Sequence, residues 1–198
     1  MTDRYVYLAS ASPRRRELLD QIGVPYRLQP ADVDETARAG EPPDEFALRM
    51  AKQKARTAQT KITDAGRPVL GADTVVSIAG DILGKPASEG HATEMLRRLS
   101  GKRHEVTTAV AVVKDAAEYS AVSTSEVEFR ELSDAEIAAY LNSGESDDKA
   151  GAYAIQGLAA AFIARLQGSY SGVVGLPLFE TAELLSQVGI TIFAQDEN

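Results

Sequence analysis

Residues 69–76 read VLGADTVV, an apolar run that predicts a strand buried inside a sheet. Asp73 and Thr74 interrupt this run. Because an unpaired buried carboxylate is costly, we expect Asp73 to be ion-paired, hydrogen-bonded or bound to a metal ion. The competing interpretation is a strand end or a bulge, where the carboxylate only caps a turn. Asp73 is the first candidate for a functional residue.

The first hundred residues alternate between strand-like and helix-like patterns. They predict, in chain order, a strand at 5–9, a helix at 13–22, a strand at 26–29, a helix at 44–63, the central strand at 68–78 and a helix at 88–99. One face of the last helix is apolar and should be buried; it carries Ala92, Met95, Leu96 and Leu99.

The pattern changes beyond residue 100. Residues 105–113 and 122–132 alternate with a period of two on either side of the turn KDAAEY, which predicts an antiparallel hairpin. Ser133 and Glu136 form a capping-box signature for a further helix. The tail predicts strands at 153–155 and 161–165, then a glycine-rich loop and a helix after Pro177. Together these elements predict a mixed α/β fold, in a single domain of residues 1–198 without a separable linker.

Composition narrows the chemistry that the chain can support. The net charge of −8 argues against a nucleic-acid partner, which requires clustered positive charge. Cysteine is absent, so thiolate nucleophiles and cysteine zinc sites are excluded. His91 and His104 are the only histidines, which argues against a histidine-rich metal site, and we expect both to be structural or surface residues. No apolar run approaches the roughly 20 residues that cross a bilayer, so we expect a cytoplasmic protein without a membrane partner.

The segment LASASPRRRELL at residues 8–19 places three arginines at the start of a predicted helix. Ser12 and Pro13 suit the N-cap and the first helical position, so Arg14 and Arg15 follow at the positive end of the helix dipole. A bound phosphate would turn this unfavourable placement into affinity. The alternative is a solvated basic turn at the surface.

The helix predicted at 44–63 carries one charge on the face expected to point inward. Phe46, Met50 and Lys54 follow one another at a spacing of four residues, beside a row of alanines. Lys52 falls on the other side of the helix and should be solvated. Lys54 is therefore a candidate ligand for an anionic substrate, and the alternative is that it snorkels to solvent at the helix end.

Two loop motifs add candidates of lower specificity. In LGKP at residues 83–86, Lys85 lies between a glycine and a proline, and in DKAGAYAIQG at residues 148–157, Gln156 precedes a glycine. A lysine in a tight turn and a glutamine in a loop are ordinarily solvated. Neither motif assigns a function by itself.

Taken together, SASPRRRELL, GADTVV, LGKP, DKAGAYAIQG and GSYSGVVGLPL resemble the Maf family of nucleoside triphosphate pyrophosphatases, in order from about residue 5 to about residue 185. The resemblance implies an inosine-triphosphatase-like (Maf/Ham1) α/β fold, with an elongated twisted mixed sheet, helices and two lobes around a nucleotide cleft. It also implies hydrolysis at the α-phosphate by a homodimer. GAYAIQG, with an arginine after SPR, is similar to the branch that acts on dTTP and UTP rather than on 7-methyl-GTP.

The resemblance implies roles for individual residues. Asp73 matches the family's proton acceptor, which would deprotonate the attacking water. The positions that tune base specificity match Arg15, Thr74 and Gln156. The other substrate-contacting positions match Ser10, Arg14, Lys54 and Lys85. Because a glutamine amide offers both a donor and an acceptor, Gln156 can complement a uracil-like edge.

A divalent metal ion, Mg²⁺ or Mn²⁺, is also implied, and it would neutralise charge that develops at the phosphorus. Glu35, in ADVDET at residues 31–36, matches the family's acidic metal position alongside Asp73. Its neighbour Asp34 leaves open which of the two reaches the metal. The chain departs from the family where Ala11 replaces a frequent glycine and where Gly172 replaces a common asparagine.

Two other functions are compatible with these residues. The family has been linked to septum formation and cell division, so the chain could be a nucleotide-binding regulator with little turnover. The acidic residues at 35 and 73 favour turnover, because a pure sensor needs no base. The third interpretation is a house-cleaning enzyme that acts on modified pyrimidine nucleotides.

Overall fold

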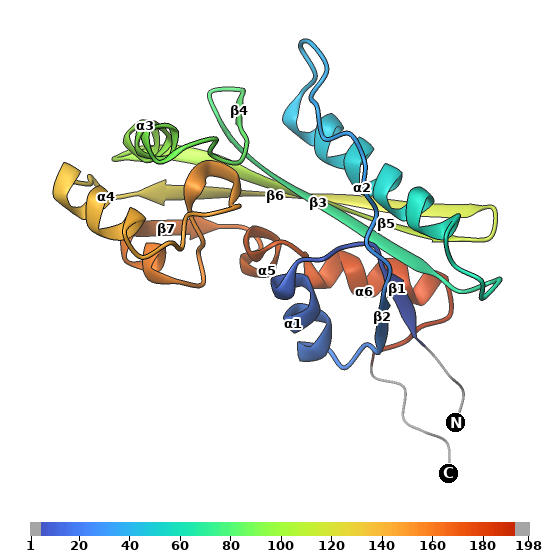
Figure 1. Ribbon diagram of the computed structural model, residues 1–198. Coiled ribbons are helices and arrows are strands. Elements are labelled where there is room, and N and C mark those ends of the chain that lie inside the picture. Colours follow the sequence, from blue (N-terminus) through green and yellow to red (C-terminus); the bar gives the residue numbers. More distant parts are fainter. Residues whose placement is uncertain (1–4, 193–198) are drawn as a thin grey trace.

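In the computed structural model, which describes residues 5–192, a seven-stranded mixed sheet runs the length of the molecule (Figure 1). Its strand order is β2-β1-β3-β5-β6-β7, and β4 also pairs with β3. The parallel part is short: β1 (Val6–Leu8) pairs with β2 (Tyr26–Leu28) on one side and with the start of β3 (Val69–Ile78) on the other. Each of these three strands matches a predicted one to within two residues.

Antiparallel pairing builds the rest of the sheet. The strand β3 pairs with β5 (Arg103–Lys114) along nearly its whole length and with the short β4 (Asp81–Leu83) at its end. The predicted hairpin is formed by β5 and β6 (Ala117–Phe129), and β7 (Ile163–Gln167) adds to the end of β6. The mixed α/β fold class is therefore confirmed.

One edge of β3 is left open in its middle. Pairing with β1 covers Val69 and Leu70, and pairing with β4 covers Val76 to Ile78. Between them, residues 71–75 have no strand partner on that edge within the described part of the chain. A ligand at this open edge can therefore contact side chains on both faces of β3.

The helix α2 (Pro43–Gln59) covers one face of the sheet (Figure 1). Its backbone approaches β3 closely because residue 71 is glycine: a Cβ there would lie 2.3 Å from the carbonyl oxygen of Ala51. Side chains alternate along a strand, so Asp73 points to the α2 face and Thr74 to the opposite face. Close packing at Gly71 brings Lys54 of α2 onto Asp73.

The opposite face carries the larger apolar cluster, to which the other five α-helices of residues 5–192 contribute. These are α1 (Pro13–Gln21), α3 (Glu89–Leu99), α4 (Asp134–Leu141), α5 (Tyr170–Val174) and α6 (Leu178–Gln187). In Figure 1, α3 and α4 gather at one end of the long hairpin, and α1 and α6 lie toward the other. None of the helices described is both long and apolar enough to cross a membrane.

Several predicted elements are confirmed in detail. The apolar face of α3 is buried, and Ser88 caps this helix by accepting the His91 N–H. Ser133 and Glu136 form the predicted capping box at the start of α4. Pro13 occupies the first helical position of α1 after Ser12, although the Ser12 side chain makes no capping hydrogen bond.

The predicted strand at 153–155 is wrong. These residues are buried but follow an irregular path after Gly151 and Ala152, which both have positive φ. The Ala154 N–H donates to the Tyr140 hydroxyl oxygen instead of joining a strand ladder. A short apolar run does not distinguish a buried loop from a buried strand, which explains the error.

Other boundaries are shifted. The last strand begins at Ile163 because a 3-10 helix, Leu158–Phe162, precedes it, and α2 ends at Gln59 rather than at residue 63. The hairpin turn is shorter than predicted, with Asp115 at a φ of 53°, so both strands extend further toward it. The elements missed from sequence include the two 3-10 helices, Ala150–Ala152 and Leu158–Phe162, the edge strand β4, and the short helix α5 within the predicted glycine-rich loop.

Candidate active site

A cavity of about 1230 Å³ opens at the free edge of β3. Its walls come from the turn before α1, the segment before α2, the β4 turn, the loop after α4 and the end of α5. All nine candidate residues line it, namely Ser10, Arg14, Arg15, Glu35, Lys54, Asp73, Thr74, Lys85 and Gln156. The volume is large enough for a nucleotide-sized ligand. The structure thus brings the candidates together, and their roles stay predictions.

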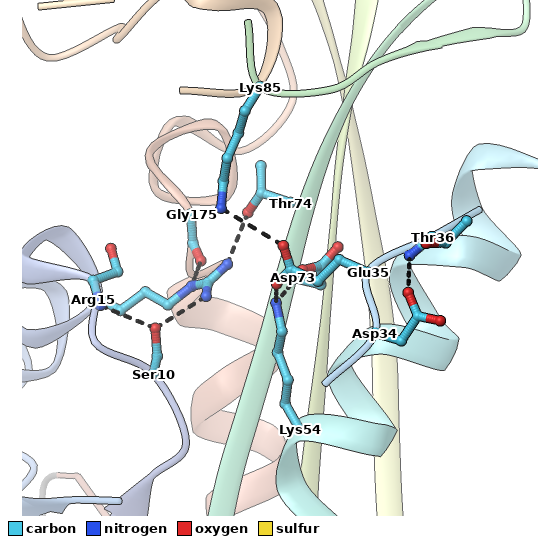
Figure 2. Close-up of polar contacts among 11 residues, drawn as sticks. Ser10, Arg15, Asp34, Glu35, Thr36, Lys54, Asp73, Thr74, Lys85 and Gly175 are labelled. Carbon is cyan, nitrogen blue, oxygen red and sulfur yellow. Dashed lines mark hydrogen bonds and ion pairs between the residues drawn. The ribbon is translucent and has the colours of Figure 1, made fainter. Parts of the chain in front are cut away.

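An ionic cluster lies on the α2 side of β3 (Figure 2). The Lys54 ammonium is 2.7 Å from Asp73 Oδ1 and 2.6 Å from Glu35 Oε1, and the Lys85 ammonium is 3.6 Å from Glu35 Oε2. Lys54 and Asp73 are buried, whereas Glu35 and Lys85 are exposed. The expectation that a buried Asp73 has a partner is confirmed, and so is the inward direction of Lys54.

The two carboxylates of this cluster have opposite pKa shifts. Burial raises the pKa of Asp73, and the charges of Lys54 and Arg15 do not fully offset it. Partial burial also acts to raise the pKa of Glu35, but its hydrogen bond to Lys54 and the charges of Lys54 and Lys85 outweigh it, so that pKa is lowered. Relative to free side chains, the protein thus favours the protonated form of Asp73 and the ionised form of Glu35.

The structure separates Asp34 from Glu35. Asp34 is turned away from the cavity, and its Oδ1 accepts the Thr36 N–H at 3.0 Å (Figure 2). Glu35 and Asp73 converge on the same ammonium. Within residues 5–192, no group of three or more acidic, histidine or cysteine side chains is placed to hold a metal ion, so the predicted metal position consists of these two carboxylates.

A hydrogen-bond network lies on the other side of β3, in which the buried Arg15 contacts uncharged groups. Its Nε donates to the Gly175 carbonyl at 2.8 Å, one terminal nitrogen donates to Ser10 Oγ at 3.1 Å, and the other to Thr74 Oγ1 at 3.3 Å (Figure 2). All three nitrogens of the guanidinium are thus engaged with the protein. Arg15 joins α1, β3 and the end of α5.

Arg14 differs from its neighbour. It is half-buried at the cavity wall, and within the described residues its guanidinium makes no hydrogen bond or ion pair. Ser10 is also poised toward a ligand: its oxygen accepts from Arg15 and from the Ser12 N–H at 3.2 Å. Because a hydroxyl has two lone pairs and one hydrogen, both acceptor positions of Ser10 are filled and its hydrogen is left to donate. Both side chains offer donors to an anion.

Gln156 is exposed at the tip of a turn that Glu145 holds in place. The Glu145 carboxylate accepts the Leu158 N–H at 2.8 Å and the Ala159 N–H at 3.3 Å. A Cβ at position 157 would lie 2.2 Å from this carboxylate, so a larger residue after Gln156 would displace the Glu145 side chain from the turn. Sequence reasoning missed Glu145, because nothing in the acidic run GESDD marks one residue as a turn anchor.

The histidines are confirmed as structural or surface residues, and neither lines the cavity. His91 is exposed, and its Nδ1 accepts the Ala87 N–H at 3.2 Å. His104 is buried edge-on against Phe129 and Tyr153, with Nε2 at 2.8 Å from the Tyr153 hydroxyl. Burial lowers the pKa of His104 to about 4, so it is neutral at neutral pH.

The sequence profile described as Maf-like protein matches residues 5–188. The chain belongs to the Maf family. Among similar Maf-family proteins are the dTTP/UTP pyrophosphatase of Nitrosomonas europaea, 50% identical over 95% of this chain and 96% of that protein, and that of Ralstonia nicotianae, 52% identical over the same shares. A third, from Alkalilimnicola ehrlichii and of the same name, is 52% identical over 94% of both chains. Family and relatives together cover nearly all described residues, including the whole cavity.

Proposed function

We propose that this Maf-family chain hydrolyses dTTP and UTP to the nucleoside monophosphate and pyrophosphate, by attack of water at the α-phosphate. The observation that carries the proposal is the cavity itself, in which the buried carboxylate of Asp73 contacts Lys54 and lies near Arg15, with Glu35 as the second carboxylate on Lys54. The relatives that bear the name dTTP/UTP pyrophosphatase supply the substrate class. A regulator without turnover would have no use for a buried base.

The triphosphate is held by the donors that the protein leaves free. Arg14 contributes a guanidinium without an internal partner, Lys85 an exposed ammonium, and Ser10 its remaining hydrogen. These groups line the same cavity as Lys54 and Asp73, so we expect the phosphates to lie near the ionic cluster. Charge-assisted contacts of this kind are the strongest that a phosphate makes.

Asp73 accepts the proton of the attacking water. A carboxylate at its ordinary pKa is a weak base at neutral pH, and the raised pKa of Asp73 brings it closer to the range in which a general base works well. Lys54 limits this shift and orients the carboxylate through its 2.7 Å contact. Its second contact, with Glu35, keeps the two acidic side chains together.

A divalent cation fits the donor set at this point. Mg²⁺ is commonly bound by one or two carboxylates together with substrate phosphates, and Asp73 and Glu35 provide two carboxylates that converge beside the phosphate-binding donors. When bound, Mg²⁺ or Mn²⁺ would neutralise charge that develops on the phosphoryl oxygens. Asp34 lies outside this set.

A nucleotide panel tests the proposal. Purified protein is assayed with and without MgCl₂ or MnCl₂ against canonical and modified nucleoside triphosphates, and pyrophosphate and phosphate are measured separately. We expect pyrophosphate from dTTP and UTP, dependent on the metal. Phosphate alone would contradict cleavage at the α-phosphate, and tight binding without turnover would make the chain a regulator. A modified pyrimidine nucleotide with a higher kcat/KM than UTP would identify a house-cleaning enzyme.

The homodimer and the cytoplasmic location that the family resemblance implies stay predictions. Light scattering coupled to size-exclusion chromatography measures the first. Cell fractionation with an antibody against the native protein measures the second.

A further inference from the structure

A second hydroxyl lies behind Thr74, on the neighbouring strand. Thr108 of β5 is the residue opposite Thr74 in the β3–β5 ladder, and its Oγ1 lies 2.9 Å from Thr74 Oγ1. It is fully buried and does not line the cavity. Its hydroxyl donates to the Gly172 carbonyl oxygen of α5 at 2.7 Å. A chain of hydrogen bonds therefore runs from Arg15 through Thr74 and Thr108 to α5.

The direction of this chain is fixed at both ends. The guanidinium of Arg15 can only donate, and the carbonyl of Gly172 can only accept. Thr108 uses its single hydrogen on Gly172, so the hydrogen between the two threonines must come from Thr74. Thr74 therefore has no hydrogen left, and one of its two lone pairs already accepts from Arg15. What Thr74 presents to the cavity is an acceptor.

We propose that Thr108 is a positioning residue for base selection, because it holds Thr74 as a hydrogen-bond acceptor and so selects bases that carry an N–H at the pairing edge. This inference rests on the proposed function, since it assumes a pyrimidine nucleotide in the cavity. Thr74, the turn at Gln156 and the end of α5 line the same cavity, so a base bound there can come within reach of Thr74.

The two pyrimidine types differ at the relevant atom. In uracil and thymine, ring nitrogen N3 carries a hydrogen, whereas in cytosine it is a bare acceptor. Against a fixed acceptor, uracil gains a hydrogen bond and cytosine leaves two lone pairs facing each other. A free hydroxyl would not discriminate, because it rotates to donate or to accept. A fixed direction at Thr74 is what makes the distinction.

Gln156 cannot make this distinction alone. Its side chain is exposed and its amide has no hydrogen-bond partner within the described residues, so it can turn either its oxygen or its nitrogen toward the base. The exocyclic oxygen of uracil and the amino group of cytosine would both be satisfied. The Thr74 hydroxyl, which Thr108 fixes as an acceptor, can therefore make the distinction that the exposed Gln156 amide cannot.

The test compares Thr108→Val with two controls. Thr108→Ser keeps the hydroxyl, and Thr107→Val removes the adjacent hydroxyl, which pairs with Thr124 on the other face of β5. For each protein, kcat/KM is measured for UTP and CTP, and equilibrium binding is measured with the α,β-imido analogues of both nucleotides, which are not cleaved. Circular dichroism and thermal unfolding establish that each variant is folded.

In Thr108→Val the hydrogen of Thr74 is released to the cavity, so we expect the UTP-over-CTP preference to fall by roughly ten- to hundredfold, mainly because CTP improves. Thr108→Ser and Thr107→Val should keep the wild-type preference. An unchanged ratio in folded Thr108→Val, or an equal loss for both nucleotides, overturns the inference. Because the analogues report base preference without cleavage, an inactive wild type that still prefers the uridine analogue refutes only the proposed hydrolysis.

Discussion

The two faces of β3 present different chemistry to the same cavity. On the α2 face, Asp73 lies in a cluster of opposite charges with Lys54 and Glu35. On the other face, Thr74 lies in a network in which Arg15 is the only charged group and each hydrogen bond has a fixed direction. Neighbouring residues on a strand point to opposite sides, so one step along the chain separates the two environments.

Under the proposed function, this difference would let one cavity both catalyse hydrolysis and discriminate between bases. Ionic contacts can exchange one partner for another, which suits the binding and release of phosphates and a metal ion. A network of directed hydrogen bonds around buried groups cannot rearrange without leaving one of them unsatisfied, which suits recognition of a base. We expect substitutions on the Asp73 face to change turnover, and substitutions on the Thr74 side to change preference.

The largest effect should come from Asp73→Asn. We expect kcat for UTP to fall by roughly 10²- to 10⁴-fold, because the general base is lost. In metal-free buffer the affinity for UTP should not fall, since the substitution removes an anion that repels the triphosphate. Steady-state kinetics and equilibrium titration measure the two quantities separately. Asp34→Asn is the matched control and should leave both unchanged; turnover of Asp73→Asn within about tenfold of the wild type would remove Asp73 from the role of base.

Lys54→Met should lower the free energy of unfolding by about 3 kcal/mol, because it leaves the buried Asp73 without its partner. Lys52→Met is the control: Lys52 is half-exposed and pairs with Glu118, and such a surface pair contributes about 1 kcal/mol or less. Urea unfolding at neutral pH measures both. Equal losses in the two variants would mean that the ionic cluster on the α2 face stabilises the fold no more than an ordinary surface ion pair does.

His104 provides a test of which groups make the stability of the fold depend on pH. The unfolded chain protonates this histidine near pH 6.5, and the folded protein only near pH 4, so its contribution to stability is complete above pH 6.5 and is lost as the pH falls toward 4. We expect a loss of roughly 3 kcal/mol across this window, and a smaller loss in His104→Phe. Urea midpoints measured between pH 4 and pH 7 give the slope. The same slope in both proteins would place the acid sensitivity elsewhere, with the carboxylates of the ionic cluster as the first candidates.

The smallest effect is expected at Gln156. Gln156→Ala should reduce the UTP-over-GTP preference in kcat/KM by up to about tenfold, because one exposed hydrogen bond to the base is lost. The exposed Gln53, on α2, offers the control Gln53→Ala. Competition assays with both nucleotides in one tube measure the ratio directly. If Gln156→Ala keeps the wild-type ratio while kcat falls, Gln156 belongs with the reacting side of the cavity rather than with base recognition.

Sequence alone located the charged side of the site because its residues break a pattern. Asp73 and Lys54 are charges in otherwise apolar rows, and that conflict marks them without knowledge of the fold. Their contact could not be predicted, since it depends on the close approach of α2 at Gly71. The choice between Asp34 and Glu35 was equally out of reach, because adjacent residues differ only in the direction that the loop gives them.

The hydrogen-bonded side was harder to predict. The two threonines at 107 and 108 interrupt an apolar strand, which was a usable signal, but only the register with β3 shows that Thr108 meets Thr74. The engagement of Arg15 with Gly175 joins residues 160 positions apart, and no local pattern indicates it. The loop at 153–155 was mistaken for a strand because burial, not backbone conformation, determines its apolar composition.

The most direct test of the central claim is hydrolysis of UTP in oxygen-18-labelled water, followed by mass spectrometry of both products. Attack at the α-phosphate places the label in the uridine monophosphate and none in the pyrophosphate, which is the result we expect. Label in the pyrophosphate, or labelled inorganic phosphate as the first product, would contradict the assignment of Asp73 and its neighbours to cleavage at the α-phosphate.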